Sequence, residues 1–205
     1  MAAKAPDWLS RNPPALQKIT GKRVGIIGLG GLGSNITMML ARAGVTSFRL
    51  VDFDTVSIEN LNRQHYFLHH LGQKKTLALA AQLRELTPSL TLELLDQRIE
   101  EHDLEDFCRG CDVLVEAVDD AATKAMLFSW FVRHSPSLWL VTASGLGSLG
   151  PANEIRTVRL AERIVACGDF VTSSEGQNGV CAPRVMVAAA HQALAVLRIL
   201  TGMEP

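Results

Sequence analysis

Residues 23–35 read RVGIIGLGGLGSN, an apolar run followed by four closely spaced glycines and then by Ser34 and Asn35. A strand that turns through glycines into a helix lets the backbone approach a phosphate closely, and the free N–H groups of the helix N-terminus face its charge. The stretch therefore predicts a nucleotide-binding strand–turn–helix unit. It does not select the nucleotide, because its glycine spacing alone also fits a nicotinamide-dependent dehydrogenase.

From this unit onward, strands and helices alternate along the chain. The apolar patterns predict strands at 23–28, 47–53, 90–96, 112–118 and 138–144, and helices at 31–43, 73–86, 103–109, 121–134 and from about 183 to 201. Residues 155–168 carry two apolar stretches with no helix between them, which predicts added antiparallel strands. We expect an α/β, Rossmann-like fold with a mostly parallel central sheet, antiparallel strands in its C-terminal part and helices on both faces.

Composition bounds the kind of protein. Hydrophobic residues make up 47% of the 205 residues, enough for a substantial core, and the length suits one domain. We expect an N-terminal arm over 1–22 and a single nucleotide-binding domain over 23–205. The 20 basic residues nearly balance the 21 acidic ones, so we expect no nucleic-acid or membrane partner. The chain shows no apolar run of membrane-spanning length and no export signal, so a cytoplasmic location is expected.

Cysteines and histidines raise the question of a metal site. The cysteines are Cys108, Cys111, Cys167 and Cys181. The first two form a C-x-x-C without the second ligand pair that a structural zinc site usually needs, so we expect no zinc and a buried role for Cys111. Three histidines between residues 65 and 70 lack a carboxylate or cysteine at ligand spacing, which favours solvated or packing roles.

Polar residues follow the second predicted strand. Asp52 ends that strand, where a dinucleotide-binding fold places an acid on the ribose hydroxyls. Arg63, Lys74 and Lys75 come soon afterwards. A nicotinamide enzyme has little use for these cations beside the phosphates, whereas transfer of a nucleotidyl group must balance a triphosphate. The stretch therefore favours ATP over NAD.

Four motifs occur in a fixed order: GLGGLGSN (28–35), VDFDTVSIENLNRQ (51–64), LGQKK (71–75) and EAVDD (116–120). Together they resemble the ThiF/MoeB/HesA family of the ubiquitin-activating-enzyme superfamily, over about residues 21–202. The stretch NPPALQKITGKRVGIIGLGGLGSN (12–35) and the short length resemble most of all its compact ThiF-like members of thiamine biosynthesis. The resemblance implies a homodimeric adenylyltransferase that uses ATP and Mg²⁺. Its implied substrate is the C-terminal glycine carboxylate of a small ubiquitin-like sulfur-carrier protein ending in Gly-Gly, with release of pyrophosphate.

The resemblance also implies roles for single residues in binding the nucleotide. The residues that match the nucleotide loop are Gly28, Gly30, Gly31 and Gly33. Asp52 matches the ribose-binding acid, and Asn60 and Arg63 match polar residues that hold the phosphates. Each of these charged residues could instead be an ordinary surface or turn residue, as most such residues are.

The implied catalytic set adds three residues. Lys75 matches the essential lysine of the family, and we expect it to be an exposed loop residue. Asp119 matches the magnesium-associated aspartate, while Asp120 either assists it or caps the next helix. Arg11 matches the N-terminal arginine that one subunit inserts into its partner's site. Unlike larger members, the chain lacks the two zinc-binding C-x-x-C pairs in its C-terminal half. Some members also carry a cysteine there that joins the sulfur carrier covalently. Cys181 lies in that region but its surroundings, GVCAPR, do not match the motif, so its covalent role stays open.

Other functions fit the same residues. The acceptor could be another carrier, such as the small subunit of molybdopterin synthase, or a carboxylate on a small molecule or RNA. A nucleotide-binding module without catalysis would not need Arg63, Lys75 and Asp119. A dehydrogenase would need an acid–base group for hydride transfer, and none accompanies the glycine loop.

Overall fold

A computed structural model describes residues 8–87, 89–134, 137–173 and 179–205. Its centre is a seven-stranded sheet in the order β3-β2-β1-β4-β5-β7-β6. The strands are β1 (Arg23–Ile27), β2 (Ser47–Val51), β3 (Thr91–Leu95), β4 (Val113–Glu116), β5 (Trp139–Ala143), β6 (Arg156–Ala161) and β7 (Ile164–Gly168). Neighbouring strands are parallel except for the antiparallel pair β6–β7. The predicted fold class is confirmed.

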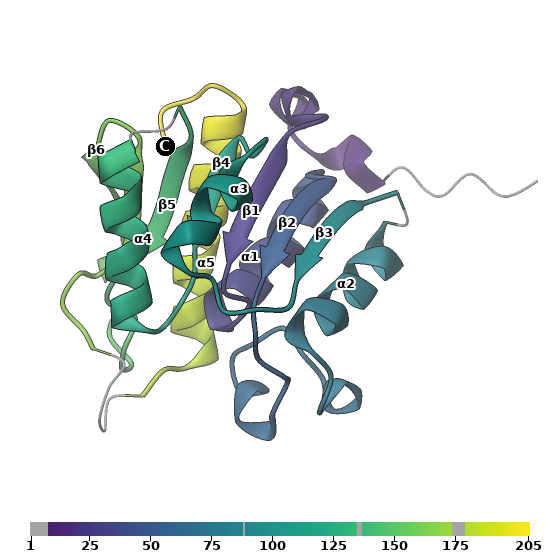
Figure 1. Cartoon of the computed structure of the whole chain (residues 1–205), viewed down its shortest axis with the longest axis vertical. Helices are drawn as coiled ribbons and strands as arrows, with labels where there is room; N and C mark the ends of the chain where they lie inside the picture. Colours follow the sequence, from purple (N-terminus) through teal and green to yellow (C-terminus); the bar gives the residue numbers. More distant parts are fainter. Residues whose placement is uncertain (1–7, 88, 135–136, 174–178) are drawn as a thin grey trace, which may run out of the picture.

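Helices cover both faces of this sheet. They are α1 (Gly31–Ala43), α2 (Lys75–Leu86), α3 (Leu104–Cys108), α4 (Ala121–His134) and α5 (Ala182–Leu200). Apolar side chains of α1, α2 and α5 form one core cluster with the sheet, and those of α3 and α4 form a second cluster on the other face. Figure 1 shows α3 and α4 in front of the strands, with α1 and α5 behind. Because both faces are covered, the central strands β1 and β4 are buried almost throughout.

Local chemistry sets the ends of these elements. The predicted helix at 31–43 ends as expected because Gly44 takes a left-handed conformation, with φ 106°, and its N–H bonds to Leu40 and Ala41 carbonyls. The helix predicted from residue 73 begins later, at Lys75, because Lys74 is extended and bridges Thr55. The strand predicted over 112–118 stops at Glu116.

The N-terminal segment packs against the domain. The 3₁₀ helices η1 (Trp8–Arg11) and η2 (Pro14–Ile19) lie before β1, and residues 1–7 lie outside the described residues. Ile19 is buried in the core cluster of α1 and α5, and Asn12 Nδ2 donates to the Arg42 carbonyl at 3.2 Å. The expected arm therefore contacts the C-terminal end of α1.

Helix α5 is long and apolar enough to cross a membrane by length and composition alone. Half of that span is buried inside the domain, where it packs against α1 and four strands of the sheet. Val185 and Ala189 are buried, while Leu194 is exposed. The apolar face of α5 therefore belongs mainly to the core.

The glycine-rich turn after β1 is sterically closed to side chains at two positions. Gly28 has φ 88°, and a Cβ there would lie 2.8 Å from the Ala117 carbonyl oxygen. A Cβ on Gly33 would lie 1.8 Å from the Gly28 carbonyl oxygen. Gly33 therefore lets α1 start directly against the loop rather than contacting a ligand itself.

We expect Gly33→Ala to lower the free energy of unfolding by about 3 kcal/mol, because the backbone contact can be relieved only by moving α1. Gly30→Ala is the matched control, since a Cβ there meets only Gln64 Nε2 at 3.8 Å. Urea unfolding of both variants at pH 7 makes the comparison. Equal stabilities of the two variants would contradict the packing role of Gly33.

Candidate functional site

The carboxyl ends of the parallel strands surround a cavity of about 570 Å³. Its position is the point where β1 is flanked by β2 on one side and β4 on the other, the place where open α/β sheets bind ligands. The predicted site residues that line it are Gly28, Gly30, Gly31, Asp52, Arg63, Lys75 and Asp119. The fold thus brings most of the predicted set to one cavity of ligand-binding size.

Asp52 braces the glycine loop. Its Oδ2 accepts a hydrogen bond from the Leu29 N–H at 2.6 Å, and its Oδ1 accepts one from the Asp54 N–H at 2.8 Å. The Tyr66 hydroxyl donates to the Leu29 carbonyl at 2.9 Å. Burial, and then the charges of Asp52 and Asp54, raise the pKa of Tyr66 well above its ordinary value, so it remains a donor. A carboxylate has further lone pairs for ribose hydroxyls.

Lys75 is not the exposed loop residue that the sequence predicts. It is the first residue of α2, only 4% exposed. Its Nζ forms an ion pair with Asp54 Oδ2 at 2.7 Å, and Asp54 is half-exposed. The Lys75 N–H also donates to the Asp54 carbonyl at 3.0 Å. The bridge that ties Lys74 to Thr55 brings the start of α2 under the strand ends. Asp54 therefore holds the lysine at the cavity wall.

Arg63 lies beside the glycine loop. A Cβ on Gly31 would be 3.4 Å from Arg63 Cγ, so the aliphatic part of the side chain packs on the loop. Its Nη1 donates to the Glu59 carbonyl at 3.2 Å and to Asn62 Oδ1 at 2.8 Å. The other guanidinium nitrogens form no hydrogen bond to the described residues, so they can donate to an anion.

The two acidic residues after β4 have different roles. Asp119 is exposed and lines the cavity. Asp120 caps α4, because its Oδ2 accepts bonds from the Thr123 N–H at 2.7 Å and the Thr123 hydroxyl at 2.6 Å. These bonds lower the pKa of Asp120. The capping alternative for Asp120 thus holds, whereas Asp119 has no hydrogen-bond or ion-pair partner among the described residues.

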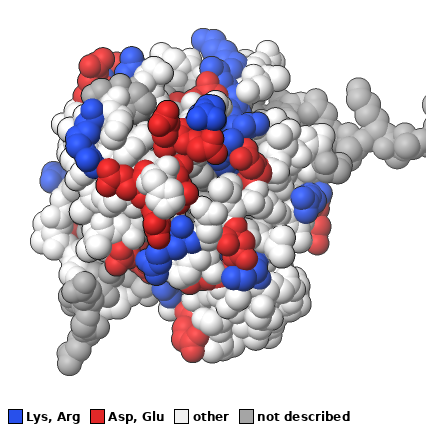
Figure 2. All heavy atoms as spheres, viewed as in Figure 1, with Lys and Arg blue, Asp and Glu red and all other residues white. Residues whose placement is uncertain are grey.

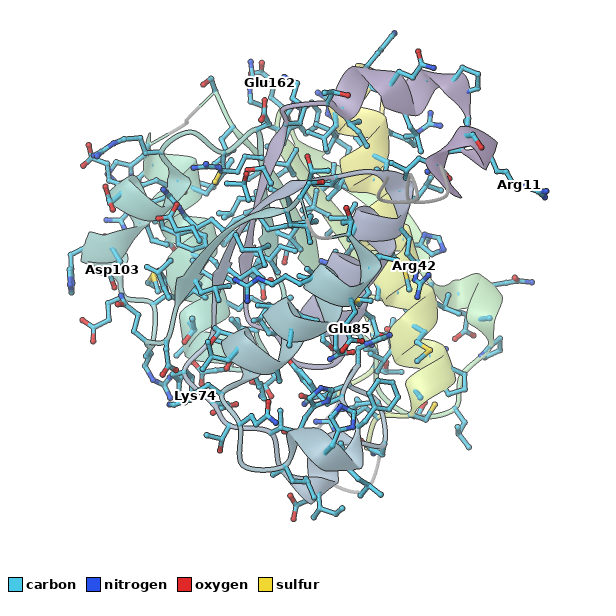
Figure 3. The ribbon with its side chains drawn as sticks, turned by 90° about the vertical axis from the view of Figure 1, so that its right-hand side faces the viewer. Arg11, Arg42, Lys74, Glu85, Asp103 and Glu162 are labelled. Carbon is cyan, nitrogen blue, oxygen red and sulfur yellow. The ribbon has the colours of Figure 1, made fainter. Side chains whose placement is uncertain are left out.

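Three predicted residues lie outside the cavity lining. Gly33 is packed inside α1. Asn60 caps the 3₁₀ helix η3 (Ile58–Asn60), where its Oδ1 accepts the Ser57 N–H at 3.0 Å. Arg11 is exposed at the end of η1 and points away from the body of the molecule in Figure 3. The roles of these residues in nucleotide binding stay predictions.

The cavity also has walls that the motifs do not single out. Arg98 lies over the Phe53 ring at 4.3 Å, and both line the cavity. Gln64 is 8% exposed, and its Oε1 has no hydrogen-bond partner among the described residues. A buried carbonyl oxygen in a cavity wall is costly unless a ligand or water satisfies it. Of these wall residues, only Arg98 could have been indicated from sequence, by its position just after β3.

A buried ion pair supports the wall on the β5 side. Arg184 of α5 pairs with Asp169 and donates to the Gly150 carbonyl at 2.5 Å. Burial would raise the pKa of Asp169, but hydrogen bonds from Thr172, Val171 and Arg184 outweigh burial and hold the pKa well below its usual range. Thr172 itself lines the cavity. The pair thus fixes the loops after β5 and β7.

Because the folded pKa of Asp169 is depressed, its stabilisation is complete above the unfolded pKa of about 4 and is lost as the pH falls toward the folded value. We expect Asp169→Asn to lower the free energy of unfolding by about 3 kcal/mol at pH 7, since the buried Arg184 loses its short ion pair and keeps only a longer one, at 3.7 Å, to the exposed carboxylate of Glu154 among the described residues. The difference in the free energy of unfolding between wild type and variant should narrow below about pH 4.

The control for this prediction is Asp106→Asn, which removes an exposed ion pair with Arg109. Urea unfolding from pH 7 to 3 measures both, and a constant difference would contradict this account.

Cysteines and histidines near the core have packing roles. Burial raises the pKa of Cys108 to about 12 and that of Cys111 to about 11, the opposite of a reactive or metal-binding pair. His70 is buried, and its Nδ1 accepts the Phe67 N–H at 3.0 Å. Within the described residues, no group of three potential metal ligands occurs among His, Cys, Asp and Glu. Cys181 precedes α5 and is half-buried, 3.7 Å from the Ser148 carbonyl.

Comparison with known proteins identifies the family. Residues 7–205 match the ThiF family. The chain belongs to the ThiF family. The sulfur carrier protein ThiS adenylyltransferase of Escherichia coli is 32% identical over 193 residues, which cover 92% of this chain and 76% of that protein. A tRNA threonylcarbamoyladenosine dehydratase of Haemophilus influenzae is 28% identical over 154 residues, 74% of this chain but only 58% of its own length.

Solved structures of similar proteins share the fold. The E. coli tRNA threonylcarbamoyladenosine dehydratase in complex with ATP has a TM-score of 0.83, with 20% identity, and the match covers 92% of this chain and 89% of that one. The E. coli protein MccB with ATP has a TM-score of 0.71 and 22% identity, over 93% and 59% of the two chains. This chain thus shares its fold with two proteins whose structures were solved in complex with ATP.

Proposed function

We propose that this ThiF-family chain is an ATP-dependent adenylyltransferase that activates the C-terminal glycine carboxylate of a small sulfur-carrier protein and releases pyrophosphate. One observation carries the proposal: the glycine loop, Asp52, Arg63, Lys75 and Asp119 line a single cavity. Family membership supports the same hypothesis, since similar proteins include one named sulfur carrier protein ThiS adenylyltransferase and one named molybdopterin-synthase adenylyltransferase.

The cavity suits ATP. Asp52 has free lone pairs for the ribose hydroxyls, and the N-terminus of α1 offers N–H groups to a phosphate. The Gln64 Oε1 atom, which has no hydrogen-bond partner in the described part of the chain, gives the cavity an acceptor for a ligand N–H or O–H. The exposed Asp119 carboxylate is a hard oxygen ligand of the type that Mg²⁺ takes together with phosphate oxygens. Bound there, Mg²⁺ would neutralise charge on the leaving pyrophosphate.

The chemistry needs positioning and charge neutralisation. A C-terminal carboxylate is ionised at neutral pH, so no general base is required for its attack on the α-phosphorus. Negative charge builds on the oxygens of the departing pyrophosphate, where Arg63 and Lys75 can donate. Asp54 keeps Lys75 in place before the substrate arrives.

The proposal extends to partner and setting. We propose a ThiS-like carrier ending in Gly-Gly, a role in formation of the thiamine thiazole, and a homodimer in the cytoplasm. The four cysteines are free, which is consistent with a reducing compartment. Adenylation of a carrier like the small subunit of molybdopterin synthase is the alternative within this class, because relatives named molybdopterin-synthase adenylyltransferase are also similar.

A second candidate is activation of a carboxylate on RNA. Relatives named tRNA threonylcarbamoyladenosine dehydratase favour it. The formal net charge of −1 gives it no support, and basic and acidic side chains are interspersed over the face seen in Figure 2. RNA-binding surfaces are expected to be strongly basic.

Exchange of labelled pyrophosphate into ATP tests the proposal. The purified chain is incubated with Mg²⁺, ATP and, in turn, a ThiS-like carrier, a molybdopterin-synthase-like carrier and threonylcarbamoylated tRNA. Each carrier is also offered without its last glycine as the matched control. We expect exchange with the intact ThiS-like carrier and none with the truncated one. Exchange with tRNA but with neither carrier would favour the second candidate. If none of the acceptors supported exchange, a non-catalytic nucleotide-binding module would be favoured.

Calorimetry separates ATP from NAD. We expect binding of ATP with Mg²⁺ to exceed binding of NAD, because Arg63 and Lys75 suit a triphosphate. Tight NAD binding without a response to ATP would overturn the proposal at its first step.

A further inference from the structure

A second cavity adjoins the proposed nucleotide site. It has a volume of about 430 Å³ and lies between α4 and the strands β5, β6 and β7. Apolar side chains contribute much of its lining, including Phe128 of α4 and Leu160 of β6. The residues that line both cavities are Ala121, Lys124, Ala143 and Ser144. Lys124 is the charged residue of this shared wall.

Lys124 is held in a fixed position. Its Nζ pairs with Glu116 Oε2 at 2.5 Å and donates to the Ala143 carbonyl at 3.0 Å. Glu116 is 1% exposed and is itself fixed, because its carboxylate accepts hydrogen bonds from the Thr142 hydroxyl and from the Val118 N–H. An ammonium group has three donors. Two of them are used within the described residues, and the side chain is still 32% exposed.

The order of strands gives Lys124 a particular place along the cavity. Asp52 follows β2, the glycine loop follows β1, Asp119 follows β4, and Lys124 contacts the end of β5. Since these strands are adjacent in that order, a nucleotide bound as proposed would have its ribose and phosphate groups in the β2–β1–β4 part. Lys124 lies beyond them, toward the second cavity. A second substrate that meets the α-phosphate from that side passes this ammonium group.

We propose that Lys124 binds the carboxylate of the acceptor substrate, an inference that rests on the proposed adenylation. One carboxylate oxygen attacks the α-phosphorus, while the bond from phosphorus to the bridging oxygen breaks and pyrophosphate leaves with that electron pair. The second carboxylate oxygen becomes the acyl carbonyl oxygen. The free N–H of Lys124 donates to this second oxygen before and after the step, so Lys124 orients the nucleophile and no proton is transferred.

A purely structural role makes a different prediction. If Lys124 only neutralised the buried Glu116, its loss would lower stability without changing the relative affinities of ligands. Lys124→Met leaves a buried carboxylate unpaired, so a second variant, Lys124→Met with Glu116→Gln, removes that charge as well. Lys22→Met is the matched control, because Lys22 pairs with Asp112 at 2.8 Å at the amino ends of β1 and β4, away from the cavity at their carboxyl ends.

The experiment compares two stable adenosine ligands by calorimetry. One is 5′-O-(N-glycylsulfamoyl)adenosine, which mimics the glycyl adenylate, and the other is 5′-O-sulfamoyladenosine, which lacks the acyl group. We expect wild type and Lys22→Met to bind the glycyl compound about tenfold more tightly than the unacylated one. Both Lys124 variants should lose this preference while keeping wild-type affinity for the unacylated compound.

Three results of the calorimetry would overturn the inference. They are a wild type without preference for the glycyl compound, Lys124 variants that keep the preference, and variants that lose affinity for both ligands equally although they remain folded. The last would make Lys124 a nucleotide ligand. Pyrophosphate exchange by wild type with an intact carrier, absent with the truncated one, tests the proposed function separately. Exchange that occurs normally in the Lys124 variants would therefore reject this inference alone.

Discussion

Lys75→Ala is expected to lower the rate of pyrophosphate exchange by about 10²–10³-fold, the loss typical of removing one preorganised donor from a developing charge. In wild type the ammonium is buried and aimed by Asp54, so no reorganisation is needed when the pyrophosphate departs. Alanine cannot replace this charge. The effect should be in the chemical step rather than in the affinity for ATP.

The fold should survive this substitution. Asp54 is half-exposed, so its carboxylate regains water when the lysine is removed. Lys74→Ala is the matched control: Lys74 pairs with Asp96 at 3.1 Å, is 40% exposed and does not line the cavity. Exchange rates, ATP affinity and melting temperature are measured for both variants. A large fall in melting temperature for Lys75→Ala, or equal exchange rates in the two variants, would reject the catalytic role.

Much of the fold is predictable from sequence because its signals are local. The run VGIIG and the glycines after it predict the first strand, turn and helix, and Gly44 predicts where that helix ends. The two apolar stretches between 155 and 168 predict the antiparallel pair. The end of β4 is harder to predict from local sequence, because Glu116 turns inward and bonds to Lys124 and Thr142, which belong to other elements.

The site is predictable only in part. Residues at the ends of successive parallel strands must meet at one edge, so Asp52 and Asp119 could be grouped from the pattern. Burial of Lys75 depends on the Thr55–Lys74 bridge, which no spacing reveals. Lys124 belongs to the cavity because β4 and β5 are neighbours in space, a consequence of strand order rather than of any motif.

Arg11→Ala is expected to reduce exchange by about 10³-fold or more if its guanidinium acts as an arginine finger. In the folded chain, Arg11 cannot reach the nucleotide site of its own subunit. Its segment packs at Gly44, the C-terminal end of α1, while the glycine loop lies at the other end of that helix. The 13 residues of α1 separate the two by roughly 20 Å, more than an arginine side chain reaches. Figure 3 shows Arg11 and Lys74 on opposite sides of the molecule.

In a two-fold dimer, each Arg11 could instead complete its partner's site. Mixing the inactive Arg11→Ala and Lys75→Ala chains should then restore activity, because the Arg11→Ala chain supplies Lys75 and the partner supplies Arg11 to one site of every mixed dimer. Random exchange of equal amounts gives half mixed dimers with one working site of two, so about a quarter of wild-type activity is expected. Arg42→Ala, which removes an exposed arginine near the same helix end, should keep full activity. If verified mixed dimers stayed inactive, or if Arg11→Ala alone were fully active, Arg11 would have no role in a partner's site.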